Sequence, residues 1–305
     1  MAPPTPFWGP FTPARQRAVA IFGAGDRLVA CAVPVDFGVS IFVTDQTVAP
    51  GDLGRLVEER GFGALFVPEH THIPRTTVRD VDARYRRSLD PFVVLTAAAA
   101  ATTRLRLGTG ILLIVQRDPI VTAKALASLD HVSGGRLEVA VGAGWNVPEI
   151  ENHGTPFDRR FGVMRERVEA MKAIWTQDEA SYHGRHVQFD DIACWPKPVQ
   201  RPHPPVLVGG NGERVLDRVL RYGDGWFPNR MDGLGGRIAD LRRRAADAGR
   251  DGVPVTYFGA PAEAAAVEDL AAAGVDRVLF MLPTAPPGEV EAAADAAAAV
   301  AERFR

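Results

Sequence analysis

The most constraining feature of this sequence is the stretch from Leu105 to Trp145, which has the pattern of a strand, a helix and a second strand. Asp118 is a favourable helix N-cap, and Pro119 follows at a position where its missing N–H costs nothing. Gly134 and Gly135 can adopt the left-handed conformation that ends helices. The flanking segments are short and rich in Val, Ile and Leu, which predicts two parallel strands joined by this helix.

Both predicted strands of this unit carry glycines near their C-terminal ends. These are Gly108 and Gly110 in the first strand and Gly142 and Gly144 in the second. Parallel α/β folds bind their ligands at the carboxyl ends of the strands, where backbone without side chains leaves room for a flat ring. A β-bulge is the more ordinary reason for glycine in a strand, so the glycines alone do not establish a site.

The composition excludes several classes of protein. The chain has 305 residues, of which 46% are apolar and 24% charged, and its formal net charge is −2. This near-zero charge gives no indication of a nucleic-acid or membrane-surface partner, and no apolar run approaches the roughly 20 residues of a membrane-spanning helix. The two cysteines, Cys31 and Cys194, form neither a disulfide framework nor a metal-binding spacing, so we expect a cytoplasmic protein.

Strand and helix patterns alternate from residue 35 to the end of the chain. Eight predicted strands, each followed by a helix, favour a (β/α)8 TIM barrel over a doubly wound sheet. The strands are expected at residues 36–42, 64–68, 105–114, 137–145, 206–208, 225–227, 255–258 and 277–282. The helix after the first strand is expected to be capped by Asp52, and residues 71–90 and 146–157 are expected to be loops.

An insertion is expected after the helix that follows the fourth strand. Residues 181–189 have the pattern of a hairpin, and the proline-rich residues 195–205 that of an extended strap. Residues 1–34 contain five prolines before residue 14 and do not continue the alternation. We therefore expect an unstructured N-terminal extension over 1–34 and one (β/α)8 domain over 35–305.

Candidate functional residues follow the second predicted strand. Glu69 and His70 come directly after it, and His72 lies two positions further on. The two histidines would share one face of an extended segment, but no further His or Cys cluster completes a metal site, so we predict no bound metal. His70 is predicted to act in acid–base chemistry or ligand binding, with a structural role as the alternative.

The turn Gly209-Gly210-Asn211-Gly212 joins the fifth predicted strand to a helix. Free N–H groups at a helix N-terminus suit a phosphate, while glycine can also serve the turn itself, and both interpretations stay open here. The chain contains three lysines, and none of them follows a strand, which argues against a Schiff-base aldolase.

Seven motifs, taken together and in order, resemble the bacterial-luciferase-like flavin or deazaflavin oxidoreductases over residues 36 to about 285. They are Phe66-Val-Pro-Glu-His-Thr-His-Ile-Pro, Leu107-Gly-Thr-Gly-Ile-Leu, Asp118-Pro-Ile-Val-Thr-Ala-Lys, Leu129-Asp-His-Val-Ser-Gly-Gly-Arg, Val141-Gly-Ala-Gly-Trp, Pro196-Lys-Pro-Val-Gln-Arg-Pro-His-Pro-Pro and Tyr222-Gly-Asp-Gly-Trp. The segment from Val67 to Pro74 most resembles the branch that uses coenzyme F-420, a 5-deazaflavin that carries hydride.

The resemblance implies a planar cofactor ring over the barrel mouth, backed by a cis peptide between Gly110 and Ile111. His70 would lie near the reacting edge as the catalytic residue. The residues implied to bind the cofactor are Glu69, His70, Gly110, Ile111, Ala143, Gly144, Trp145, Gly209, Gly210 and Asn211. Trp145 stands where sugar-phosphate dehydrogenases of this family have a glutamate, which puts that activity in doubt and suits an apolar substrate. Ala143 stands where a hydroxyl often contacts the cofactor.

Three functions follow as hypotheses. The first is hydride transfer between coenzyme F-420 and a small organic substrate. The second is an FMN-dependent monooxygenase, which differs in that its reduced cofactor reacts productively with oxygen. The third is a non-catalytic flavin-binding barrel, in which His70→Ala would change nothing but folding. The resemblance also implies a homodimer through the barrel helices.

Overall fold

The computed structural model describes residues 35–79, 81–250 and 252–305, so the extension expected over 1–34 lies outside the described residues. Eight parallel strands form one sheet in the order β8-β7-β4-β3-β2-β1-β10-β9. The strands are β1 (Asp36–Ser40), β2 (Ala64–Val67), β3 (Arg106–Leu112), β4 (Leu137–Val141), β7 (Val206–Gly209), β8 (Gly225–Phe227), β9 (Thr256–Ala260) and β10 (Arg277–Met281).

The two edges of this sheet meet between β8 and β9. A parallel bridge joins Trp226 to Val255, and the N–H of Phe258 donates to the carbonyl of Pro228 at 2.9 Å. The sheet is therefore a nearly closed barrel, and the predicted (β/α)8 TIM barrel is confirmed.

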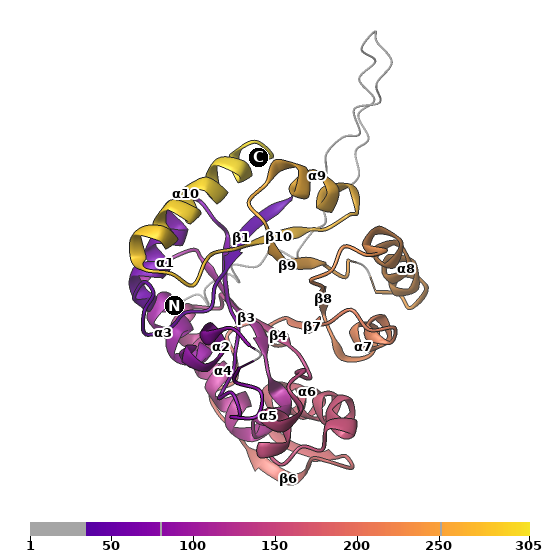
Figure 1. Cartoon of the computed structure of the whole chain (residues 1–305). Coiled ribbons are helices and arrows are strands. Elements are labelled where there is room, and N and C mark those ends of the chain that lie inside the picture. Colours follow the sequence, from indigo (N-terminus) through magenta and orange to yellow (C-terminus); the bar gives the residue numbers. More distant parts are fainter. Residues whose placement is uncertain (1–34, 80, 251) are drawn as a thin grey trace, which may run out of the picture.

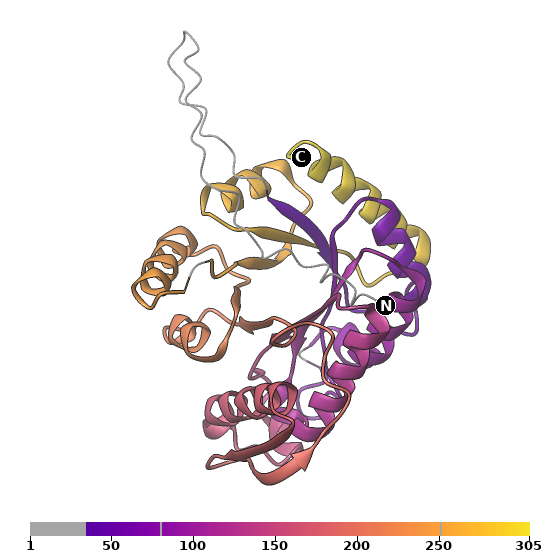
Figure 2. The same cartoon turned by 180° about the vertical axis from the view of Figure 1, so that it is seen from behind.

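Helices surround the barrel in both views (Figures 1 and 2). The outer ring comprises α1 (Pro50–Glu59), α3 (Pro91–Ala101), α4 (Pro119–Ser133), α6 (Arg160–Thr176), α7 (Val215–Tyr222), α8 (Leu234–Asp247), α9 (Ala264–Ala272) and α10 (Pro287–Glu302). The connections hold the shorter α2 (Ala83–Arg87), α5 (Val147–Asn152), η1 (Ile114–Gln116) and η2 (Phe157–Arg159). Among the residues that the structure describes, no helix is long and apolar enough to cross a membrane.

Helix α4 has the ends that its sequence predicts. The carboxylate of Asp118 accepts the N–H groups of Ile120 and Val121, both at 2.9 Å. At the other end Gly134 has φ of 65°, and its N–H donates to carbonyls of the last turn. An N-cap aspartate and a left-handed glycine thus delimit this helix, as predicted.

Three local predictions were wrong. Helix α1 begins after Ala49, and Asp52 lies in its first turn paired with Arg55 instead of capping it. The expected loop at 71–90 contains α2, whose N-cap Asp82 accepts the N–H of Arg84 at 2.9 Å. The expected loop at 146–157 contains α5, and Pro148 in its first turn is a helix-start feature that the sequence analysis overlooked.

A separate hairpin follows α6. Strands β5 (Glu179–His183) and β6 (Gln188–Ala193) pair in antiparallel fashion outside the barrel sheet, close to the predicted hairpin. Figure 1 shows this hairpin at the outer edge of the molecule, beside α6. Residues 194–205 then lead to β7, so this excursion occurs between a barrel helix and the next barrel strand.

The barrel interior contains an apolar layer and a charged layer. The apolar layer includes Phe66 and Phe227, whose ring centroids are 5.3 Å apart. The charged layer lies near the amino ends of the strands, where Glu138 on β4 pairs with Arg106 and accepts hydrogen bonds from Arg277 at 2.9 and 3.0 Å. Burial alone would raise the pKa of Glu138, but Arg277 and Arg106 together lower it to about 2.

Candidate functional site

Four ring side chains gather at the carboxyl ends of the barrel strands. Phe42 follows β1, His70 follows β2, Trp145 follows β4, and Tyr85 comes from α2. The ring centroid of His70 lies 4.8 Å from that of Tyr85, 5.8 Å from that of Trp145 and 6.5 Å from that of Phe42. Trp145 is 52% exposed, so part of its ring remains accessible. This rim can hold a planar, largely apolar group.

A carboxylate fixes the orientation of His70. Its Nδ1 lies 2.9 Å from Oε2 of Glu149 on α5, and the two side chains are 6% and 1% exposed. The other oxygen of Glu149 accepts the N–H of Thr71 at 3.3 Å. With Nδ1 engaged, Nε2 is the ring nitrogen that can serve a ligand. A buried histidine held by a carboxylate in this way can hold or move a proton.

Glu69 is engaged by a different set of residues of the protein. Its buried carboxylate accepts the N–H of Leu113 at 2.7 Å and Nε of Arg117 at 2.6 Å, and Arg117 also donates to Asp90 at 2.6 Å. Burial raises the pKa of Glu69 in spite of the opposing charge of Arg117. Glu69 therefore anchors the segment between β3 and α4, and its direct contact with a cofactor stays a prediction.

The peptide between Gly110 and Ile111 is cis, as the resemblance implies. The side chain of Ile111 projects across the ends of the two neighbouring strands. A Cβ at Gly142 would lie 1.9 Å from Cδ1 of Ile111, and a Cβ at Gly209 would lie 2.9 Å from its Cγ2. Glycine at these two positions therefore makes room for Ile111 at the barrel mouth, rather than exposing bare backbone.

The position of Ile111 gives a prediction for Gly142→Ala. The new methyl group must displace the end of the Ile111 side chain into the mouth, where the cofactor ring is expected. We expect a folded protein whose cofactor affinity falls about tenfold, because overpacking costs are of this size. The measurement is a fluorescence titration with coenzyme F-420.

The matched control is Gly142→Ala combined with Ile111→Val. Removing Cδ1 leaves Cγ1 of residue 111 as the nearest side-chain atom, 3.2 Å from the new Cβ. The double variant is expected to recover most of the lost affinity, which makes the two substitutions non-additive. Equal affinity loss in the single and double variants would mean that Ile111 does not transmit the effect.

The turn after β7 is held by both neighbouring elements. Gly210 has φ of 113°, a conformation that favours glycine, and its carbonyl accepts the indole N–H of Trp226 at 2.9 Å. Arg237 on α8 donates to the carbonyls of Asn211 and Gly212 at 2.6 and 2.8 Å. This arrangement brings a positive charge next to the N-terminus of α7, which suits a phosphate, although binding by Gly209, Gly210 and Asn211 stays a prediction.

Two buried amides near the rim have atoms that a bound ligand could satisfy. Asn146 donates to the hydroxyl of Thr77 at 3.2 Å, and Gln116 accepts the hydroxyl of Thr71 at 3.2 Å. Within the described part of the chain, Oδ1 of Asn146 and Nε2 of Gln116 are buried without a hydrogen-bond partner. Because unsatisfied buried polar atoms are costly, these two favour a polar cofactor edge or water at the mouth.

The segment of residues 143–145 positions the aromatic rim. Ala143 is buried, whereas Gly144 has φ of 72°, and a Cβ there would lie 3.0 Å from Ile150 on α5. This turn carries the chain from β4 to Trp145 and packs it against the helix that bears Glu149. Gly144 thus allows the backbone to turn between β4 and Trp145. Contacts of Ala143 and Gly144 with the cofactor ring remain predictions.

The other two histidines near the mouth form a separate polar cluster. The hydroxyl of Thr71 lies 2.8 Å from Nε2 of His153 and 3.0 Å from Nδ1 of His72. Burial, together with the nearby His72, lowers the pKa of His153. Over residues 35–79, 81–250 and 252–305, no three His, Cys, Asp or Glu side chains are arranged to hold a metal ion.

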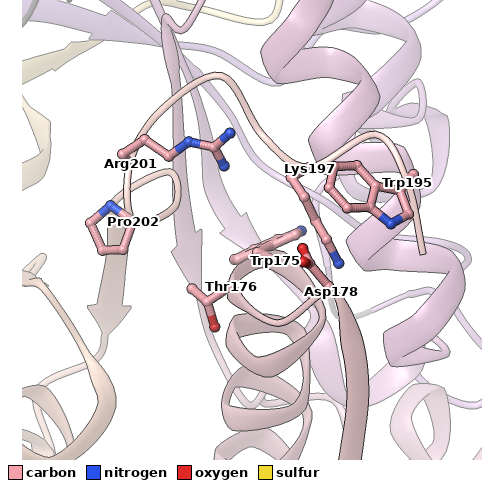
Figure 3. Close-up of a pocket in the computed structure, with 7 residues that line it drawn as sticks. All are labelled: Trp175, Thr176, Asp178, Trp195, Lys197, Arg201 and Pro202. Carbon is pink, nitrogen blue, oxygen red and sulfur yellow. The ribbon is translucent and has the colours of Figure 1, made fainter. Parts of the chain in front are cut away.

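A cavity of about 280 Å³ lies at the other end of the barrel (Figure 3). It lies where α6 ends and where the chain approaches the start of β7, far in the fold from the carboxyl ends of the strands. Lys197 donates to the carbonyl of Ile174 at 2.7 Å and also to that of Gln177. This lysine therefore caps the C-terminus of α6.

Sequence reasoning missed Glu149, Tyr85 and Arg117. Glu149 and Tyr85 lie in segments that were expected to be loops, and Arg117 lies in the bend between η1 and α4. The helix-start pattern of Asn146 and Pro148 could have placed Glu149 in a first turn, but its pairing with His70 spans 79 residues. A local pattern carries no information on such a distant contact.

The sequence profile described as luciferase-like monooxygenase matches residues 49–299. An uncharacterized protein of Mycobacterium tuberculosis is 43% identical over 283 residues, covering 88% of this chain and 96% of that protein. An FMNH2-dependent dimethylsulfone monooxygenase of Pseudomonas putida is 37% identical over 155 residues, covering 49% of this chain and 42% of that protein.

Two solved structures share the fold. The monooxygenase RslO1 from Streptomyces bottropensis has a TM-score of 0.75 and 22% identity, covering 87% of this chain and 98% of that chain. An F-420-dependent secondary alcohol dehydrogenase in complex with an F-420–acetone adduct has a TM-score of 0.71 and 17% identity, covering 89% and 99%. At these identities the likeness concerns the fold alone.

Proposed function

The chain belongs to the luciferase-like monooxygenase family, and from this we propose that it is an oxidoreductase that binds coenzyme F-420 at the barrel mouth. Bound there, the deazaflavin would supply the hydride that passes to or from a small organic substrate. The observation that carries the proposal is the buried pair of His70 and Glu149 beside an aromatic rim. The resemblance of residues 67–74 to the F-420 branch supports this choice of cofactor.

The protein's own residues would orient the cofactor and manage the proton. Glu149 holds His70 by Nδ1, so Nε2 would face the reacting edge of the ring and hold or accept a proton there. Ile111 would support one face of the ring, since Gly142 and Gly209 let its side chain lie across the mouth. The turn at Gly209, Gly210 and Asn211, with Arg237 behind it, would receive the phosphate.

The rim favours an apolar substrate. Trp145 is half exposed, and it lies near Tyr85, with ring centroids 6.1 Å apart. The position that carries a glutamate in sugar-phosphate dehydrogenases of the family is this tryptophan, so no carboxylate is available there to contact a sugar hydroxyl. We therefore propose that the substrate is a small unsaturated or carbonyl compound and not a sugar phosphate.

An FMN-dependent monooxygenase is the second candidate. It is favoured by the 37% identity to the Pseudomonas putida enzyme, whose printed name gives FMNH2 as its reductant. The aromatic rim would accept the ring of either cofactor, because both rings are planar. The turn after β7 would accept the phosphate that each cofactor carries. The candidates differ in their reaction with oxygen.

A paired activity assay distinguishes them. In the first arm, reduced F-420 is mixed anaerobically with unsaturated and carbonyl compounds, and its reoxidation is followed optically. In the second arm, FMN with a flavin reductase is supplied in air, and substrate-dependent oxygen consumption is measured. Substrate-dependent turnover in the first arm alone is the expected result, whereas turnover in the second arm alone would overturn the choice of cofactor.

The homodimer is also a proposal. Val93 on α3 and Val121 and Val132 on α4 are exposed apolar side chains on neighbouring helices of the outer ring. Such side chains favour burial against a second copy. Sedimentation or light scattering of the purified protein tests this, and a monomer at micromolar concentration would contradict it.

A further inference from the structure

The groove between α6 and α7 is a second candidate binding site, away from the barrel mouth. These helices are neighbours in the outer ring (Figure 1), and between them lies a cavity of about 250 Å³. Its lining includes four arginines, Arg165, Arg214, Arg218 and Arg221, and one aspartate, Asp217. Drug-sized ligands occupy pockets of roughly 300–1,000 Å³, so this cavity suits a smaller molecule.

The carboxylates around the groove do not neutralise all of this charge. Arg165 pairs with Glu166 at 3.0 Å, Arg221 approaches Glu169 at 3.6 Å, and Asp217 is engaged by Arg244 from α8 at 2.6 Å. Among the residues that the structure describes, Arg214 and Arg218 have no carboxylate within ion-pair distance. The groove therefore carries a surplus of positive charge, which attracts anions.

Arg218 is partly buried without a hydrogen-bond acceptor for its guanidinium within the described chain. Its Cζ lies 3.8 Å from the ring centroid of Phe161, and Arg160 approaches the same ring at 4.4 Å. Burial and the neighbouring Arg214 lower the pKa of Arg218. A guanidinium held in place by stacking, with its donors unused, is pre-organised for phosphate or carboxylate.

Tyr222 supplies the second, independent observation. It lines the same cavity and is 5% exposed, and within the described residues its buried hydroxyl has no hydrogen-bond partner. The charges that act on this hydroxyl are those of Arg218, Glu169, Arg165 and Arg221, so three cations stand against one carboxylate. Leaving a buried hydroxyl unsatisfied is costly, and an anion in the cavity would accept its hydrogen bond.

We propose that Arg218 and Tyr222, with Arg165, Arg214 and Arg221, form a binding site for a small polyanion that carries phosphate or carboxylate groups. The site does not depend on the cofactor proposal, because none of these residues belongs to the barrel mouth. One of its arginines, Arg214, follows Asn211 of the turn after β7 by three positions. The anionic group could therefore belong either to a free small molecule or to a part of the mouth ligand that extends past this turn.

Inorganic pyrophosphate is the probe, titrated calorimetrically at low salt into the full chain without cofactor. We expect saturable binding that Arg218→Gln weakens about tenfold or more, because this substitution removes charge-assisted hydrogen bonds. The control is Arg243→Gln on α8, an exposed arginine paired with Asp240 and Asp247, which should bind as the wild type does. Absent binding, or equal loss in both variants, would overturn the proposal.

Tyr222→Phe tests the site without relying on charge. In the free protein this variant should be at least as stable as the wild type, since it removes an unsatisfied buried hydroxyl. Its pyrophosphate affinity should nevertheless fall several-fold, and unchanged affinity would contradict the assignment of Tyr222. Repeating the pyrophosphate titration with saturating F-420 or FMN distinguishes the two possible sources of the anionic group. Competition between pyrophosphate and the cofactor would indicate that the groove binds an extension of the cofactor. Simultaneous binding would indicate that it binds a free anion.

Discussion

Replacing His70 by alanine is expected to lower kcat by about a hundredfold or more, because general acid–base groups contribute 10²–10⁴ to rate. The side chain lies at the aromatic rim, with Nδ1 held by Glu149 and Nε2 left available to a ligand. Steady-state turnover of the substrate identified in the paired assay is the measurement. Circular dichroism establishes that the variant is folded, and a cofactor titration establishes that it binds the cofactor.

Two comparisons make this result interpretable. Glu149→Gln keeps a hydrogen-bonding side chain opposite Nδ1 but removes the charge, so its loss of kcat should be smaller than that of His70→Ala. His72→Ala removes a histidine two positions away that bonds to Thr71 and Asn152, and it should retain most of the activity. Full activity in His70→Ala would contradict the catalytic role assigned to this side chain.

Glu138→Gln is expected to reduce the free energy of unfolding by about 3–5 kcal/mol, because it leaves buried arginine charge without its counter-charge. Glu138 lies in the barrel interior between Arg106 and Arg277, and both hydrogen bonds from Arg277 go to its carboxylate. Urea unfolding measures the change. The matched control is Asp52→Asn, which removes an exposed pair with Arg55 and should cost less than about 1 kcal/mol.

The same network predicts how stability depends on pH. The pKa of Glu138 is about 2 in the folded protein, against 4.5 for an ordinary glutamate. The stabilisation is therefore complete above pH 4.5 and is lost as the pH falls toward 2. The difference in unfolding free energy between wild type and Glu138→Gln should shrink over this interval. A difference that stays constant from pH 7 to pH 3 would contradict the stabilising role of the charged Glu138 carboxylate.

The barrel was predictable because its local patterns repeat. Asp118, Pro119 and Gly134 delimit α4 as their sequence patterns indicate, and the alternation of strands and helices yielded the (β/α)8 fold. The short helices α2 and α5 were missed, because five and six residues are too few to show an apolar stripe and their start features are confined to one turn.

The site was only partly predictable. His70 was identified from its position after β2, but its partner Glu149 lies 79 residues further along the chain. Glu69, which the resemblance treats as a cofactor residue, binds Arg117 and the backbone of Leu113. Local patterns could place each residue at the mouth, but the pairing of charges depends on how distant segments meet in the fold.

The most direct test of the central claim is a fluorescence titration of the purified protein with coenzyme F-420 and, separately, with FMN. We expect saturable binding of F-420 that is tighter than binding of FMN. The affinity for F-420 should be weakened in Gly142→Ala and largely recovered when Ile111→Val is added. Tighter binding of FMN would shift the function to the monooxygenase. Binding of neither compound would contradict the claim that the barrel mouth holds a flavin-type ring.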